Sequence, residues 1–550
     1  MNDLLLSPFG PALILLLAGA LLRVFASPRN ALALALLTLA PLGASFVLLM
    51  TLRASGVVVR ELSWWPLVTP PLRVLWALDG WNWLALLLLL LVGGSAVLLT
   101  WQMPGKRSGA YHGLSFALLG GAALTVVSDN LLALSGAWIA TDILLVARAR
   151  GSRAKGGAAP VWLEVGGSLL VLVAIGITSI GVASTTLATA RLPAETMALL
   201  LAAAALRMAA YPLHLWLAPS VAARDRGTQL LINGLAIVTG GWLLGRVFVL
   251  GAGVWLANPI WPPVLVLLTL VAGLAAWAGR EQDRLAMLSS GRATWLWLVV
   301  ALAPTATGRD ALGWAMAGLI LALLLIAIGQ EINEQWRWRV PLMFGVLTLA
   351  GVPLTAGMAA RAFMQTPLLV LALLIVVAEA LAVAAALSGW KTAPPAATSA
   401  VSVKQPARRR IEAVNWPVLR LLVALGLAVV PSLLWSLQPT RLATQAGFTV
   451  VLSLGEMLRL YGIGQLLAVM AALGLGAGFF QLAQQPDARL RRWLEGIAAA
   501  ASLAWLLDGA RWLLQWIDLA WRNTLLVVEG EGYFGWVALA LLLAVLIVQL

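Results

Sequence analysis

Residues 80–101 read GWNWLALLLLLLVGGSAVLLTW, a run of 22 residues that contains no charged side chain. The hydrocarbon core of a bilayer is about 30 Å thick, and about 20 residues of α-helix cross it. A segment this long and this apolar therefore predicts a transmembrane helix.

Similar windows recur along the whole chain. Its 550 residues are 62% hydrophobic and 11% charged, whereas a soluble globular domain averages about 25% charged residues. We predict an all-α, polytopic transmembrane helix bundle of about 16 spans, without a soluble catalytic domain. The predicted spans lie near residues 9–27, 31–52, 80–101, 111–128, 130–148, 161–183, 195–218, 228–250, 259–279, 285–304, 311–329, 338–359, 364–388, 417–437, 462–482 and 532–549.

The composition excludes several kinds of redox site. The sequence contains no cysteine and only two histidines, His112 and His214. Disulfides, thiolate-bound iron–sulfur clusters and cysteine zinc sites are therefore excluded, and a bis-histidine haem would need that distant pair. Gly105-Lys106 lacks the rest of a phosphate-binding P-loop. We expect no cofactor and no metal in this chain.

The formal charge of +14 comes from basic residues in short links between apolar runs. Cytoplasmic links of membrane proteins are enriched in Lys and Arg, so this pattern indicates topology and not nucleic-acid binding. The basic links alternate along the chain, which places both termini on the outer face of the cell's inner (plasma) membrane. The link at 389–415 is rich in Pro, Ala and Ser and contains Arg408-Arg409-Arg410, so we predict a flexible, basic cytoplasmic loop.

One late segment has a different pattern. From Asp508 to Arg522 the polar residues recur at spacings of three and four, and tryptophans lie among the apolar neighbours. This is the period of an amphipathic helix. We predict a helix near 489–525 that lies along the cytoplasmic surface of the bilayer.

Three local patterns follow one another in a fixed order. The first is SDNLLAL at 128–134, followed by Trp138. The second is RMAAYPLHLWL at 207–217, followed by Thr239-Gly240-Gly241 and Arg246. The third is LAGVPLTAG at 349–357, ending at Arg361, and EQDRLAMLSS at 281–290 lies between the last two.

In this order and at this spacing, the patterns resemble the antiporter-like membrane subunits of respiratory complex I (NADH:quinone oxidoreductase), nearest its largest one. Subunits of multi-subunit sodium/proton antiporters and membrane-bound hydrogenases belong to the same family. The resemblance covers about residues 70–365, and the late amphipathic helix is similar to the family's lateral helix. It implies other membrane and peripheral subunits as partners.

The resemblance also implies two inverted five-helix repeats, each with a helix broken at the bilayer midplane. Pro212 interrupts one predicted span, and Gly351, Pro353 and Gly357 interrupt another. Broken helices at membrane depth usually line a polar cavity. The alternative explanation for either break is a proline kink without function. The expected divisions are N-terminal helices in 1–110, a first repeat in 111–250, a second in 259–388, the basic loop at 389–415 and C-terminal helices in 416–550.

The sequence departs from the family at the residues of the implied proton path. In the family, a glutamate of the fifth span pairs with a lysine of the seventh, and that glutamate position falls on Ile139. Asp142, about one turn further on the same side of the helix, is the candidate substitute. The implied lysine positions of the seventh and twelfth spans are Arg207 and Arg361, and the eighth-span position falls near Ile232, with Asn233 beside it.

Arginine in place of lysine changes the expected chemistry. All four lysines lie in predicted links. A buried lysine changes protonation when desolvation shifts its pKa, whereas arginine keeps its proton in proteins. Arg207 and Arg361 are therefore expected either to keep a neighbouring carboxylate ionised or to line a chain of water molecules with positive charge. Asp142 is the expected partner of Arg207, either as a fixed ion pair or as part of a conducting path.

Four other polar residues are candidates. Glu164 and Glu379 lie within apolar runs, where each is either a relay residue or a paired structural carboxylate. His214 follows Pro212 at the position of a family histidine and has the side chain suited to proton transfer near neutral pH. Asp79 is expected to cap a helix.

These observations favour a proton-translocating, antiporter-like membrane subunit of a multi-subunit oxidoreductase or hydrogenase-type complex, with redox chemistry in partner chains. A structural membrane subunit without ion transport is a second hypothesis, favoured by the missing lysines. An energy-coupling subunit of a cation/proton antiporter or a bicarbonate uptake system is a third.

Overall fold

The computed structural model describes most of the chain as two compact units, Met1–Ala501 and Ser502–Leu550. The described residues are 6–25, 31–65, 72–100, 108–151, 161–178, 180–183, 185–187, 189–217, 226–279, 281–336, 339–365, 368–388, 416–484 and 488–528, with 537 and 540–542. The basic loop predicted at 389–415 lies outside them, as does most of the span predicted at 532–549.

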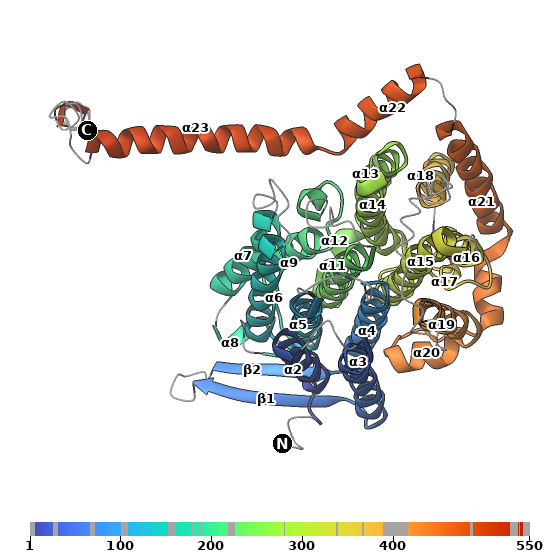
Figure 1. The fold of residues 1–550 in the computed structure, drawn as a ribbon, viewed down its shortest axis with the longest axis horizontal. Coiled ribbons are helices and arrows are strands. Elements are labelled where there is room, and N and C mark those ends of the chain that lie inside the picture. Colours follow the sequence, from blue (N-terminus) through green and yellow to red (C-terminus); the bar gives the residue numbers. More distant parts are fainter. Residues whose placement is uncertain are drawn as a thin grey trace, which may run out of the picture. The chain divides into compact units, whose positions relative to one another are not determined.

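The first unit is a bundle of helices (Figure 1). Apart from 532–549, every predicted window contains a helix, which confirms the all-α class. In chain order the helices are α2 (Gly10–Phe25), α3 (Ala31–Ala54), α4 (Gly80–Thr100), α5 (Ser108–Val127), α6 (Leu131–Gly151), α7 (Val161–Ile177), α8 (Ile180–Ala183), α9 (Ala194–Arg207), η1 (Leu213–Trp216), α11 (Arg226–Val247), η2 (Phe248–Ala252), α12 (Gly253–Leu256), α13 (Trp261–Ala278), α14 (Glu281–Leu302), α15 (Gly308–Trp336), α16 (Val340–Ala350), α17 (Met358–Ala362), α18 (Leu369–Leu387), α19 (Trp416–Leu437), α20 (Pro439–Ala446), α21 (Leu454–Ala483) and α22 (Ala488–Ala501).

The bundle has the properties of a polytopic membrane protein. Within the described residues, ten helices are long and apolar enough to cross a bilayer, and a bent pair, Leu421–Leu437 with Pro439–Ala446, adds one further candidate. The helices α4 and α15 are buried over their whole apolar windows, and they form the centre of the core. The predicted total of about 16 spans and the two inverted repeats stay predictions.

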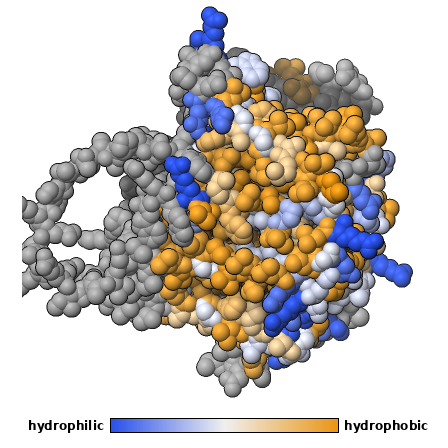
Figure 2. All heavy atoms as spheres, turned by 90° about the vertical axis from the view of Figure 1, so that its right-hand side faces the viewer, coloured by the Kyte–Doolittle hydropathy of each residue, from blue (hydrophilic) through white to orange (hydrophobic). Residues whose placement is uncertain are grey.

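The surface is apolar where the bundle would face lipid. Figure 2 shows a broad hydrophobic area on one face, with hydrophilic residues toward its edges. Helices α18, α19 and α21 carry many exposed apolar side chains, among them Leu373, Val430, Ile463, Leu467 and Met470. Exposed apolar patches of this extent are rare on soluble monomers, so the lipid bilayer is the solvent that this surface fits.

A two-stranded hairpin between α3 and α4 was not predicted from the sequence. Strand β1 (Val58–Trp65) pairs antiparallel with β2 (Leu72–Leu78), in a register that places Val58 opposite Leu78. Strand β1 is rich in the β-branched and aromatic residues that favour strands, and β2 contains one of each, Val74 and Trp76. The side-chain amide of Asn130 donates to the backbone carbonyl of Arg73 at 2.7 Å, so the SDNLLAL motif attaches the hairpin to the start of α6.

The predicted amphipathic helix is divided in two. Helix α22 ends at Ala501, the last residue of the first unit, and α23 (Ala504–Val528) belongs to the second unit. Between them Leu503 has φ 55°, a left-handed conformation in which an α-helix does not continue. In α23, Trp505, Trp512, Trp516 and Trp521 are exposed, as expected of a helix that lies at a membrane surface.

Candidate ion-translocation site

The first predicted break interrupts a helix directly after Arg207. Helix α9 ends there, Ala209 has φ 52°, and the chain resumes as the short 3₁₀ helix η1 after Pro212. Proline has no N–H to donate to a preceding turn, which accounts for the end of regular α-helix at this point. The backbone N–H of Tyr211 donates instead to Thr294 Oγ1 of α14 at 2.8 Å. The break therefore places the arginine at the end of a half-helix inside the bundle.

Arg207 forms a buried ion pair with Asp142 of α6. Its Nη1 donates to Asp142 Oδ1, and Ser168 Oγ of α7 donates to Asp142 Oδ2. The side chains of Arg207 and Asp142 are 2% and 5% exposed, and the guanidinium lies 5.1 Å from the ring centroid of Trp138. The structure thus brings together the two residues that the one-turn spacing from Ile139 paired. We call Asp142, Ser168 and Arg207 the first cluster.

The second break follows α16. Gly351 ends that helix with φ 72° and ψ 40°, a left-handed cap that glycine adopts without strain. Leu354 also has a positive φ, and the chain re-enters helical geometry at α17, beside Gly357. A Cβ on Gly357 would lie 1.9 Å from the backbone oxygen of Thr348, so only glycine lets the two segments approach this closely. Tyr461 of α21 donates to the carbonyl of Gly351 at 2.8 Å.

Arg361 of α17 joins a second buried cluster, and this one has three charges. Arg292 of α14 holds both carboxylate oxygens of Glu379 on α18, at 3.1 and 3.2 Å. Arg361 Nη2 lies 2.8 Å from Glu379 Oε2. All three side chains are at most 3% exposed. We call Arg292, Arg361 and Glu379 the second cluster.

Both arginines of the second cluster also stabilise the broken helix. Arg292 Nη2 donates to the carbonyl of Leu349 at 2.9 Å, and Arg361 Nε donates to that of Ala350 at 2.8 Å. The last carbonyls of a helix have no partner within it, so these bonds satisfy the end of α16. Sequence reasoning identified Arg361 and Glu379 but missed Arg292. The available signal was a run of polar residues, Ser289, Ser290 and Arg292, inside an apolar window.

The other predicted residues are distributed around these clusters. His214 is buried in η1 and its ring stacks on that of Tyr211, with centroids 5.0 Å apart. Asn233 is buried in α11, and neither atom of its amide has a hydrogen-bond partner among the described residues. Glu164 lies in the first turn of α7, but its side chain is outside the described part of the structure.

Helices α4, α11 and α14 hold further buried polar atoms without a partner in the described part of the chain. They are the hydroxyls of Ser95, Ser289 and Ser290 and the amide of Asn233. Helix α11 packs against both α9 and α14, and α14 packs against α18. A cavity of about 10 Å³ beside Arg207 is lined by Thr141, Ile232 and Thr239 as well. Buried polar groups of this kind are normally satisfied by internal water, so these helices provide places for water within the bundle.

A third polar group lies at the start of α4. Asp79 caps this helix, as expected, by accepting from the N–H of Asn82 at 2.8 Å. Arg246 Nη2 donates to both Asp79 Oδ2 and Asn82 Oδ1, each at 2.7 Å. Asp129, in the link between α5 and α6, is 5% exposed. Burial raises the pKa of Asp129 to about 6, Arg246 opposes this rise, and Asp79 adds to it.

The raised pKa of Asp129 predicts a pH-dependent stability. The folded chain holds this proton more tightly than the unfolded chain, whose Asp titrates near 3.8. Stability should therefore fall as the pH rises from about 4 to 6 and then stay constant. Asp129→Asn should raise the unfolding free energy by up to about 2 to 3 kcal/mol at pH 8 and leave it unchanged at pH 4. Denaturant unfolding at the two pH values measures this difference, and an equal gain at both would contradict it.

The fold is shared with solved membrane complexes. No protein-family model matches the sequence, and no curated protein matches it. A chain in the structure of the Mrp complex from Dietzia sp. DQ12-45-1b superposes with a TM-score of 0.73 at 17% sequence identity, over 100% of this chain and 63% of that chain. This chain therefore spans less than two thirds of the Mrp chain.

A second likeness covers both proteins almost completely. A chain of the membrane-bound sulfane sulfur reductase, an archaeal respiratory membrane complex, superposes with a TM-score of 0.70 at 15% identity, over 98% of this chain and 99% of that one. At such low identity the likeness establishes the fold. The chain thus shares its fold with a chain of the Mrp complex and with a chain of the membrane-bound sulfane sulfur reductase.

Proposed function

We propose that this chain is a proton-translocating, antiporter-like membrane subunit of a larger membrane complex. One observation carries the proposal: each of two broken helices places an arginine against a buried carboxylate, Asp142 in the first cluster and Glu379 in the second. A charge at membrane depth is unfavourable by several kcal/mol or more without a partner. Two such clusters, each beside a cavity large enough for a water molecule, fit an ion path through the membrane.

In this path the carboxylates and water would carry the proton, because arginine does not release its own. Asp142 would accept a proton and thereby weaken its bond to Arg207, and it would return to the ion pair when the proton leaves. Ser168 keeps the second oxygen of Asp142 oriented. Arg207 acts as a fixed positive charge that returns the acid to its ionised form after each transfer.

We infer that partner subunits supply the energy for transport. The two solved structures compared above are described as complexes, one of them respiratory. An oxidoreductase or hydrogenase-type assembly in the inner membrane fits best, with both termini of this chain on the outer face. Asp129, Asp79 and Arg246 would then lie at the outer end of the path.

Proton flux into proteoliposomes that contain the purified complex tests the proposal. The informative variant is Asp142→Asn combined with Arg207→Gln, because it removes both charges and leaves none unpaired. We expect this variant to assemble and to lose at least about tenfold in proton flux, the scale of losing one positioned proton carrier. Glu61→Gln with Arg73→Gln is the matched control, since it removes an exposed ion pair of the hairpin and should leave the flux unchanged.

A structural role without ion transport is the second candidate function. It is favoured by the fact that both buried carboxylates are already bonded to arginine. If the neutral double variant of the first cluster assembles and transports protons at the rate of the wild type, the pair is a structural bond and translocation belongs to partner subunits.

A further inference from the structure

The two clusters differ in their charge balance. The first contains one arginine and one carboxylate, whereas the second contains two arginines and one carboxylate. Arginine remains charged in essentially all protein settings. With Glu379 ionised between two guanidinium groups, the second cluster therefore carries one positive charge that no described carboxylate balances.

The hydrogen-bond donors of the second cluster are also in excess. The two guanidinium groups offer ten N–H donors, while Glu379, Leu349 and Ala350 supply the acceptors. Arg292 Nε is buried and has no hydrogen-bond partner in the described part of the chain. Arg361 Nε donates to the carbonyl of Ala350. Arg361 Nη2 lies 2.8 Å from Glu379 Oε2 but is buried and has no hydrogen-bond partner in the described part of the chain. The second cluster therefore lacks one negative charge and at least one hydrogen-bond acceptor.

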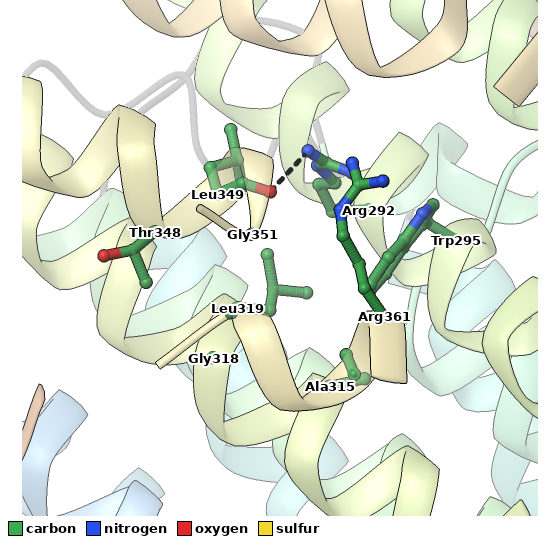
Figure 3. A pocket seen from close by; sticks show the side chains of 11 residues that line it. Arg292, Trp295, Ala315, Gly318, Leu319, Thr348, Leu349, Gly351 and Arg361 are labelled. Carbon is green, nitrogen blue, oxygen red and sulfur yellow. Dashed lines mark hydrogen bonds between the residues drawn. The ribbon is translucent and has the colours of Figure 1, made fainter. Parts of the chain in front are cut away.

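A small cavity adjoins both arginines. Its volume is about 20 Å³, and its lining includes Arg292, Arg361, Trp295, Thr348 and Gly351. Figure 3 shows the two arginine side chains beside each other at this cavity, with Arg292 bonded to the carbonyl of Leu349. A cavity needs about 10 to 15 Å³ to hold one water molecule, so this one admits a water molecule or an ion of similar size and excludes larger organic anions.

We propose that the second cluster binds one small monovalent anion of the halide class, held between Arg292 and Arg361. Such an anion supplies both the negative charge and the missing acceptor, and it fits the cavity without displacing the helix break. Because desolvated charges interact strongly in a low-dielectric interior, the excess arginine gives the anion a site that the first cluster lacks. Binding at this site does not depend on whether the chain moves protons.

Binding of radioactive chloride to the detergent-solubilised full chain tests the proposal, with bromide as competitor and gluconate as the balancing anion. The wild type should bind one chloride in a saturable, bromide-competed manner. Arg292→Gln leaves the neutral pair of Glu379 and Arg361, and should weaken chloride binding at least about tenfold. Glu379→Gln raises the cluster to two unbalanced positive charges, so it should strengthen binding by a similar factor.

Arg73→Gln is the matched control, because it removes one positive charge from the exposed hairpin and should bind chloride like the wild type. Should Glu379→Gln fail to accumulate, Arg292→Gln against Arg73→Gln still decides the question. Absence of saturable binding to the wild type, or equal binding by these two arginine variants, overturns the proposal. The assay uses no gradient, so a failure of proton transport in proteoliposomes leaves its result unaffected.

Discussion

Glu379→Gln is expected to lower the free energy of unfolding by about 3 to 5 kcal/mol, the usual cost of leaving a buried charge without its partner. Both oxygens of Glu379 bond to Arg292, and one also contacts Arg361. Glutamine is of similar size, so the loss comes from two guanidinium groups that remain buried without a countercharge. The measurement is unfolding of the solubilised chain by a denaturing detergent, in chloride-free buffer.

The matched control is Glu331→Gln. Glu331 pairs with Arg226 at 3.7 Å, and both side chains are partly exposed, at 23% and 22%. An ion pair of this kind contributes about 0 to 1 kcal/mol, so the control should be nearly neutral. Arg292→Gln should also be milder than Glu379→Gln, because it leaves a balanced pair. Equal losses for Glu379→Gln and Glu331→Gln would show that the second cluster does not hold the broken helix as described.

The positions of the helices could be predicted from the sequence because their cause is local. Uncharged runs long enough to cross a bilayer determine the windows, and most of the long helices overlap the expected windows, although the ends differ by several residues at α9, α15 and α21. The breaks were equally local, since Pro212 and the Gly351–Gly357 segment contain residues that interrupt a helix. The pairing of Asp142 with Arg207 was implied by the family resemblance, which places a glutamate at Ile139 and a lysine at Arg207, together with the spacing of one turn between Ile139 and Asp142 and the unfavourable energy of an unpaired charge at membrane depth.

What the sequence did not reveal depends on distant contacts. Arg292 and Glu379 are 87 residues apart, and nothing in either segment indicates the other. The hairpin at Val58–Leu78 lies in a link that hydropathy windows do not resolve, and its anchor is a hydrogen bond from Asn130. The division of the amphipathic segment depends on the backbone of Leu503, a residue that does not by itself predict a helix end.

A double-mutant cycle on the first cluster is the second large effect that we expect. Asp142→Asn and Arg207→Gln should each lower the unfolding free energy by about 3 to 5 kcal/mol, because each leaves one buried charge unpaired. The double variant should be more stable than either single variant, since it buries two neutral amides in the same place. Because the double variant should lose less than either single variant, the coupling energy of this pair should be at least about 3 kcal/mol, at or above the upper end of the roughly 0.5 to 3 kcal/mol that residues in one ion pair usually give.

The comparison that isolates the charge is Ser168→Ala. This substitution removes the hydroxyl that donates to Asp142 Oδ2 but keeps the ion pair, so the loss should be about 1 kcal/mol, the value of one hydrogen bond. If the two single charge variants were additive, Asp142 and Arg207 would not act as a pair and the basis for a common role would be gone. If instead the double variant is stable and proton flux is lost, the charges of this pair serve transport and not only packing. The stability cycle and the flux assay thus use the same double variant, and together they separate a conducting pair from a structural one.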